Sequence, residues 1–359
     1  MNREINICIK SVFIFIIVLL SSCGKIKNGD TLYEETKSGI VLVRVDNYYE
    51  LRSPDGYTMY FTDIDDDGSL SNLTSNQDSI KKSTGYGTGF IISDKGEIAT
   101  ANHVIQRSIN ENEVRNSIFR AIERAKSDLN YEYQSLCKDY EDLQFAIEYG
   151  DLWGEPSDNM ENRIHLYAIE QRIEECRQLY SNLSSINPHT FNISQKTSIG
   201  IAYNDTHITD DSDFIPCVSE KVDEENDLAV IQLKDKTTPK DKYAFSIPSA
   251  DPLENYSYFD KILKSIYKDK NENIFMIGFN LGPALALTSE GLKAQVNKGN
   301  ISQKQDTRLL YSIPALPGSS GSPVINSEGE LIGVNHAGIN QTQSFNYGIR
   351  VKHLRKLFE

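Results

Sequence analysis

Apolar positions follow a strand-like pattern towards both ends of the chain and a helix-like pattern in the middle. The runs "GFIIS" and "EIATA", joined by Asp-Lys-Gly, are typical of a β-hairpin, and "ELRSPDGYTMYF" predicts another around Pro54-Asp55-Gly56. Between residues 114 and 183, apolar side chains recur every three or four positions with charges between them. This heptad spacing predicts two antiparallel helices, 114–147 and 166–183, that end at Asn187-Pro188 and form a coiled coil.

The first 23 residues have the features of an export signal. Arg3 and Lys10 precede a short apolar run, and Leu20-Ser21-Ser22-Cys23 lies at the end of the run. The run is short for a bilayer span, so a cleaved signal is favoured over an uncleaved anchor. Leu20-Ser21-Ser22-Cys23 resembles a bacterial lipobox, which implies acylation of Cys23 and a lipid-anchored location in the bacterial cell envelope. A plain secretory signal is the alternative.

Composition limits the classes of function. The 359 residues, 39% of them hydrophobic, can bury a sizeable core. A formal net charge of -14 argues against a nucleic-acid partner, which needs a basic surface. Three cysteines follow Cys23, and none has the CxxC spacing of a metal site. Whether Cys137 and Cys176, on the two predicted helices, form a disulfide stays open.

Three segments in chain order carry candidate chemistry. His103 follows the second strand of the glycine-rich hairpin, Asp227 precedes the apolar run of "NDLAVIQLK", and Ser320 lies in "LPGSSGSPVIN". Each of them alone is typical of an ordinary turn or loop. Together they supply a carboxylate to orient an imidazole, an imidazole to take a proton, and a serine hydroxyl to attack a carbonyl carbon.

The motifs "GTGFIIS…TANH", "NDLAVIQL" and "GSSGSPVIN…GELIGVNHAG" resemble the chymotrypsin-like serine peptidases, in the bacterial branch that includes the Deg-type proteases and the glutamyl endopeptidases. The resemblance covers about residues 38–105 and 208–359. It implies that Ser320 is the nucleophile, His103 the general base and Asp227 the orienting acid. It also implies that the backbone amides of Gly318 and Ser320 form the oxyanion hole.

The fold implied by the resemblance is mostly β, with two antiparallel six-stranded barrels. The residues add the inserted helical hairpin and a C-terminal helix at "RVKHLRKLF". We expect a signal peptide at 1–22, a tether at 23–37, the first barrel at 38–106 and 188–240, the hairpin at 107–187, and the second barrel with the C-terminal helix at 241–359.

Substrate preference is weakly encoded. In glutamyl endopeptidases a histidine on the strand after the nucleophile binds the acidic side chain, and here Asn335, rather than His336, aligns with it. The resemblance gives four candidates for the substrate pocket: Pro314, Ala315, Asn335 and His336. Because residues 313–316 are apolar and lack an aspartate, we expect a preference for an uncharged side chain.

An acidic loop follows the second predicted hairpin. Asp63, Asp65, Asp67 and Gly68 match the start of a calcium loop, which places carboxylates at alternate positions around a hard cation. Thr74, at the twelfth position, cannot supply the closing bidentate carboxylate. We therefore expect a solvated acidic turn and no cofactor, with calcium as the weaker alternative.

The sequence thus predicts a lipid-anchored serine endopeptidase that acts on proteins or peptides, with a helical hairpin that is either an inert spacer or an arm for a protein partner. One alternative is a catalytically silent scaffold that binds a partner through that arm. Another is an esterase, but the usual nucleophile motif of that class, Gly-x-Ser-x-Gly, opens a helix, whereas Ser320 precedes a strand-like run.

Overall fold

The computed structural model describes residues 26–107, 109–149, 160–254, 269–338 and 346–359. The predicted signal peptide, Cys23 and the turn between the two helices lie outside these ranges. The chain divides into two compact units. The β unit comprises Met1–Asp46, Thr84–Ser108 and Thr197–Glu359, and the helical unit comprises Asn47–Ser83 and Ile109–Lys196.

The first sheet closes into a barrel. Its strand order is β2-β1-β3-β4-β7-β6-β5, and an additional pairing of β1 with β5 closes six of the seven strands, leaving β2 outside the ring. The strands are β1 (Ile40–Arg52), β2 (Thr58–Phe61), β3 (Ser83–Ile91), β4 (Glu97–Ala101), β5 (Asn192–Tyr203), β6 (Ile215–Asp223) and β7 (Leu228–Leu233). As predicted, β3 and β4 form a hairpin, and Gly96 in its turn has a φ of 73°.

Seven further strands form a second antiparallel sheet in the order β11-β8-β14-β15-β16-β13-β12. They are β8 (Ile274–Gly278), β11 (Gln295–Gly299), β12 (Ile301–Lys304), β13 (Arg308–Tyr311), β14 (Pro323–Asn326), β15 (Leu331–Gly338) and β16 (Asn346–Arg350). Among the described strands this sheet is an open row, where the sequence predicted a closed six-stranded barrel. A two-stranded ribbon, β9 (Leu287–Thr288) and β10 (Gly291–Leu292), lies outside both sheets.

Short helices complete the two units. In chain order they are α2 (Gly29–Thr36), α3 (Asn102–Ile105), α7 (Pro283–Ala286) and α8 (Val351–Lys356), with 3-10 turns at Lys37–Gly39, Gln77–Ser79, Pro188–Thr190 and Asp211–Asp213. α8 is the predicted C-terminal helix. The predicted fold class, mostly β with an inserted helical hairpin and a C-terminal helix, is confirmed.

The core of the β unit is built from strands that bury both faces. Alternate residues of β1 point to opposite sides, so Val41 and Val43 join one apolar cluster while Ile40 and Leu42 join another. The second cluster also takes in Phe275 of β8 and thus links the two sheets. The candidate site lies on loops of this doubly buried framework.

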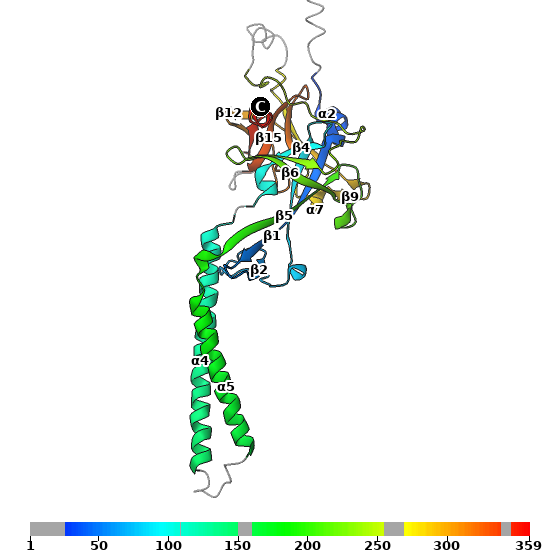
Figure 1. Cartoon of the computed structure of the whole chain (residues 1–359). Helices are drawn as coiled ribbons and strands as arrows, with labels where there is room; N and C mark the ends of the chain where they lie inside the picture. Colours follow the sequence, from blue (N-terminus) through cyan, green and yellow to red (C-terminus); the bar gives the residue numbers. More distant parts are fainter. Residues whose placement is uncertain (1–25, 108, 150–159, 255–268, 339–345) are drawn as a thin grey trace, which may run out of the picture. The chain divides into compact units, whose positions relative to one another are not determined.

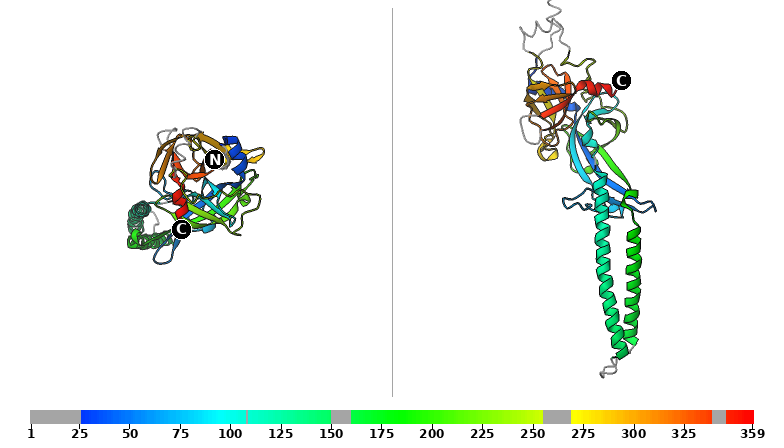
Figure 2. Two further views of the ribbon diagram at one scale, coloured as in Figure 1. Left: turned by 90° about the horizontal axis from the view of Figure 1, so that it is seen from above. Right: turned by 90° about the vertical axis from the view of Figure 1, so that its left-hand side faces the viewer.

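The helical hairpin consists of α4 (Glu111–Tyr149) and α5 (Met160–Ser185), which Figures 1 and 2 show side by side. α4 has 39 residues and is therefore about 58 Å long. The guanidinium of Arg172 donates to Glu132 over 2.7 Å, and that of Arg177 donates to the hydroxyl of Tyr133 over 3.1 Å. Among the described residues, no helix is both long enough and apolar enough to cross a membrane.

The register of the hairpin bears on the cysteine pair. Cys176 lines a small hollow with Leu129, Asn130 and Tyr133, and Tyr133 precedes Cys137 by about one turn of helix. Both thiols are free in the structure. A bridge requires α-carbons within about 7 Å, and the contacts of Cys176 include Tyr133, one turn before Cys137.

Candidate active site

Strand pairing brings His103 and Asp227 together. In the antiparallel pair of β4 and β7, Ala101 is opposite Leu228. His103 follows the end of β4, and Asp227 precedes the start of β7, so the same end of the strand pair carries both. The backbone N–H of Asn102 donates to the carbonyl of Asp227 over 3.1 Å and ties the two turns to each other.

The carboxylate of Asp227 holds His103 at two points. Its Oδ1 accepts the backbone N–H of His103 at 2.8 Å, and its Oδ2 lies 2.7 Å from Nδ1 of the imidazole. Because a carboxylate only accepts, Nδ1 of a neutral His103 carries the proton and Nε2 is left as the basic nitrogen. Asp227 has a φ of 52°, a left-handed conformation that Asp tolerates better than most residues.

Asp227 has a second imidazole partner, His336 of β15, whose Nδ1 also contacts Oδ2. Burial by itself would raise the pKa of Asp227. Hydrogen bonds from His103 and His336 outweigh that effect and hold the pKa well below its usual range. The carboxylate is therefore ionised at neutral pH, as an orienting group for an imidazole must be.

The serine loop between β13 and β14 is held against the first barrel by Thr88 of β3. The hydroxyl of Thr88 donates to the carbonyl of Gly318 over 2.8 Å, and its N–H donates to the carbonyl of Ser320 over 2.8 Å. Gly321 has a φ of 86°, and a Cβ there would lie 2.1 Å from the carbonyl oxygen of Thr88. The loop can pack this closely only with glycine at position 321.

The three serines of the loop have different environments. The hydroxyls of Ser319 and Ser322 are buried and donate to the carbonyls of Leu316 and Ser319, each over 2.7 Å. Ser320 alone is partly exposed. Its hydroxyl donates over 2.8 Å to the carbonyl of His336 and thus not to the imidazole of His103. Ser320 is accordingly the serine of this loop that a substrate can reach.

The predicted oxyanion-hole amides belong to Gly318 and Ser320. Among the described residues neither N–H donates a hydrogen bond, which leaves both available to an incoming oxygen. Gly318 has a φ of 93°, and a Cβ there would lie 2.5 Å from the carbonyl oxygen of Phe279. The backbone around the serine thus depends on glycine at position 318.

The four substrate-pocket candidates do not line one surface. Asn335 is fully buried; its amide donates to the carbonyl of Ser319 over 2.9 Å, and its oxygen accepts the hydroxyl of Tyr311 at 2.6 Å. Asn335 therefore supports the backbone of the serine loop. His336 points to Asp227, whereas Pro314 is exposed and Ala315 is partly buried.

The role of His336 was missed by sequence reasoning. The pairing of β15 with β16 shifts register between Asn335 and Ala337, so simple alternation along the strand fails at this histidine. Its carboxylate partner lies in a distant segment of the chain. The only available signal was a second histidine near the serine motif.

The acidic loop folds on itself within the helical unit. The N–H and hydroxyl of Ser69 both donate to Asp67 Oδ1, over 2.8 Å and 2.6 Å. The hydroxyl of Ser71 donates to Asp65, while the guanidinium of Arg120 donates to the carbonyl of Gly68 over 2.6 Å. These bonds organise a solvent-exposed turn.

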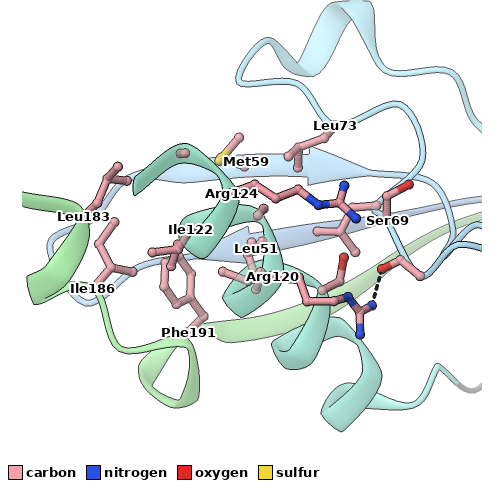
Figure 3. A pocket seen from close by; sticks show the side chains of 16 residues that line it. Leu51, Met59, Ser69, Leu73, Arg120, Ile122, Arg124, Leu183, Ile186 and Phe191 are labelled. Carbon is pink, nitrogen blue, oxygen red and sulfur yellow. Dashed lines mark hydrogen bonds between the residues drawn. The ribbon is translucent and has the colours of Figure 1, made fainter. Parts of the chain in front are cut away.

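An apolar hollow of about 360 Å³ lies beside this loop, entirely within the helical unit. Figure 3 shows side chains from β1, β2, α4 and the end of α5 converging on it, with Arg120 and Arg124 at one side. Its labelled apolar lining comprises Leu51, Met59, Leu73, Ile122, Leu183, Ile186 and Phe191. No sequence motif indicated this hollow, because it depends on how separate segments of the chain pack.

Comparison with known proteins gives one family match. The family model described as "Trypsin-like peptidase domain" matches residues 187–334. This range holds Asp227 and Ser320, and leaves out His103. No curated protein matches the sequence. Among solved structures, the crystal structure of the serine endoprotease from Yersinia pestis is similar at 14% identity and a TM-score of 0.42, over 92% of this chain and 65% of the other.

Proposed function

We propose that the protein is a serine endopeptidase in which Ser320 is the nucleophile, His103 the general base and Asp227 the orienting acid. The observation that carries the proposal is the two-point attachment of His103 to the ionised carboxylate of Asp227, in the same unit as Ser320, the one partly exposed serine among the three of its loop. The similarity of residues 187–334 to trypsin-like peptidases supports it independently.

The mechanism begins with rotation of the Ser320 hydroxyl from the carbonyl of His336 towards Nε2 of His103. The imidazole takes the hydroxyl proton while Oγ forms a bond to the substrate carbonyl carbon, and the electron pair of the C=O bond moves to its oxygen. The N–H groups of Gly318 and Ser320 stabilise that oxyanion. On collapse the C–N bond breaks, and the imidazolium gives its proton to the leaving amine.

Hydrolysis of the acyl-enzyme repeats the sequence with water. His103 takes a proton from water, the hydroxide oxygen bonds to the acyl carbon, and the ester bond to Ser320 breaks with return of the proton to Oγ. Throughout, Asp227 stabilises the charged imidazole and keeps Nδ1 turned away from the substrate. Residues 313–316, ahead of the serine loop, are apolar and carry no acidic side chain, which favours an uncharged substrate side chain.

A fluorophosphonate probe tests the nucleophile directly. The probe should label the wild-type protein once and fail to label Ser320→Ala. Ser289→Ala, which removes an exposed serine of the same unit, is the matched control and should be labelled like the wild type. Labelling of Ser320→Ala at the wild-type rate would overturn the assignment.

Membrane attachment through an acylated Cys23 is part of the proposal. The lipobox-like Leu20-Ser21-Ser22-Cys23 supports it. Cys23→Ser should leave unprocessed precursor, because lipoprotein processing depends on that thiol. Normal maturation with retention in the membrane fraction would contradict this anchor.

A second candidate function, partner or substrate binding by the helical unit, is favoured by its exposed apolar side chains. Tyr131 is 79% exposed and Tyr167 is 62% exposed, and both lie on the hairpin. Solvated tyrosines of this kind are frequent contact residues at protein interfaces.

Cleavage of a protein substrate and of a short peptide should distinguish the roles of the hairpin. Substitution of Tyr131 and Tyr167 by Ser should lower kcat/KM for the protein and leave the peptide unaffected if the hairpin binds substrate. If the variant cleaves both the protein and the peptide as fast as the wild type does, the hairpin is a spacer. A folded protein that neither cleaves peptides nor reacts with the probe would indicate a catalytically silent scaffold.

A further inference from the structure

Two imidazoles and a carboxylate converge at the candidate active site. Each of His103, Asp227 and His336 offers one ligand atom, and these atoms all lie within 4.8 Å of one another. Within the described part of the chain, this is the one place where three such side chains gather. Two imidazole nitrogens and one carboxylate oxygen form a set of ligands that zinc and similar transition metals bind readily.

The geometry centres on Oδ2 of Asp227. Nδ1 of His103 lies 2.7 Å from Oδ2, and Nδ1 of His336 contacts the same oxygen. The two imidazole rings lie edge to face at a centroid distance of 5.0 Å and an interplanar angle of 87°. Ligand atoms around a tetrahedral zinc are about 3.3 Å apart, so small side-chain rotations are enough to surround an ion.

The cluster is both anchored and accessible. The backbone N–H of His103 holds Oδ1 of Asp227, and the ring of Tyr347 packs on the ring of His336 at 4.7 Å. Such supporting contacts are what hold metal ligands in orientation. The side chain of His103 is 41% exposed, against 18% for Asp227, so an ion can enter from solvent and keep water as its remaining ligand.

We propose that His103, Asp227 and His336 bind one divalent transition-metal ion of the zinc type. The ion takes the place of the hydrogen bond between Nδ1 of His103 and Oδ2 of Asp227. Binding of the metal requires no peptidase activity. Its consequence, inhibition, rests on the proposed function: while the metal is bound, Asp227 cannot orient the imidazole for proton transfer, and hydrolysis stops.

Ligand chemistry separates this site from one for hard cations. Calcium and magnesium take oxygen ligands, and this cluster offers two nitrogens for one carboxylate. Zinc and cobalt should therefore bind where calcium and magnesium do not. Tetrahedral or five-coordinate Co²⁺ also absorbs visible light, which gives a direct readout of coordination.

The experiment is a titration of the chelator-treated full chain with Zn²⁺ and Co²⁺, followed by calorimetry and by visible absorption. One ion per chain is expected, with the same affinity in Ser320→Ala. His336→Gln should weaken binding by about a hundredfold or more. His207→Gln, which removes an exposed histidine of the same unit, is the matched control and should bind as the wild type does.

Asp227→Asn provides a second variant from the same cluster, and the thermal transition of each variant shows whether it is folded. Zinc should also inhibit peptide hydrolysis by the wild type and by His207→Gln at the same concentration. Inhibition of the residual activity of His336→Gln should need about a hundredfold more zinc.

The outcomes separate this proposal from the proposed function. Absence of stoichiometric zinc binding, or unchanged affinity in folded His336→Gln, overturns the metal site even if the protein cleaves peptides through Ser320. Zinc binding with the expected loss in His336→Gln, in a protein that does not react with the fluorophosphonate probe, supports the metal site and refutes the peptidase.

Discussion

The two units of the chain bury their side chains to very different degrees. Every residue of β7 in the β unit is buried, whereas the 39-residue α4 of the helical unit buries only Val114, Ser117 and Ile118. A strand with both faces covered allows little movement at its ends, and the candidate catalytic residues lie at such ends. A largely solvated hairpin cannot hold reacting groups with that precision, but it presents a long surface for contact.

The largest effect should follow from changes at the proposed triad. Ser320→Ala and His103→Ala should each lower kcat/KM for a peptide by about a thousandfold or more, because the proposed mechanism uses the three groups as one unit. Tyr131→Ala, on the hairpin, should leave peptide hydrolysis within about twofold of the wild type. Kinetics on one chromogenic peptide would check both, and a large loss in Tyr131→Ala would break the division between the units.

Cysteine reactivity sharpens the same comparison. Burial raises the pKa of Cys217, in the barrel, from 9.0 to about 12, whereas Cys137 is partly exposed on the hairpin. Since the thiolate is the reacting form, Cys217 should react with iodoacetamide roughly a thousandfold more slowly than an ordinary thiol. Mass spectrometry of the native protein over time measures both rates.

Two results of that labelling would count against the structure. Equal rates for Cys137 and Cys217 would show that the barrel is not closed around the latter. Recovery of Cys137 and Cys176 as a disulfide-linked peptide from the non-reduced protein would show that the hairpin register is wrong.

Core truncation should separate the units in stability. Ile277 of β8 is fully buried, and Ile277→Ala should lower the free energy of unfolding of the β unit by about 2–5 kcal/mol. Tyr167→Ala, at a side chain that is 62% exposed, should change it by less than about 0.5 kcal/mol. Denaturant unfolding with separate probes for β and helical signals gives both values, and similar losses would contradict the comparison.

Two glycines with nearly the same φ, one in each unit, sharpen the comparison of the units further. Gly321 has a φ of 86° and Gly56 a φ of 88°, but a Cβ at Gly321 meets the carbonyl oxygen of Thr88 at 2.1 Å, whereas a Cβ at Gly56 meets nothing within 4 Å. Gly56→Ala should cost about 1 kcal/mol from the dihedral angle alone. Gly321→Ala should cost about 2 kcal/mol more and abolish probe labelling at Ser320. Equal costs would show that Thr88 does not fix the serine loop.

The sequence predicted the parts of the fold that local patterns encode. The hairpin of β3 and β4, the two long helices and the proximity of His103 to Asp227 follow from periodicity, turn residues and motif order. The contact of His336 with Asp227 could not be predicted, because it depends on a register shift within β15. The open second sheet and the apolar hollow depend on packing between distant segments, and the cysteine register depends on the turn between the helices.

The smallest effect should be the pH dependence that Asp227 gives to stability. Its pKa in the folded protein lies below the usual value, so the stability it contributes is fully present above the pKa of the unfolded chain, near 3.9, and is lost as pH falls towards the folded pKa. Asp227→Asn should therefore be less stable than the wild type at pH 6, by about 1 kcal/mol, and the difference should shrink below about pH 4. Thermal unfolding of both proteins from pH 6 to pH 3 measures this difference.

Asp67→Asn is the matched change in the helical unit. Hydrogen bonds from Ser69 lower the pKa of Asp67, but the carboxylate is fully exposed. Because solvent screens it, the substitution should leave the unfolding of the protein almost unchanged. A wild-type advantage over Asp227→Asn that grew with acidity would show that the two histidines do not hold this carboxylate in its charged form.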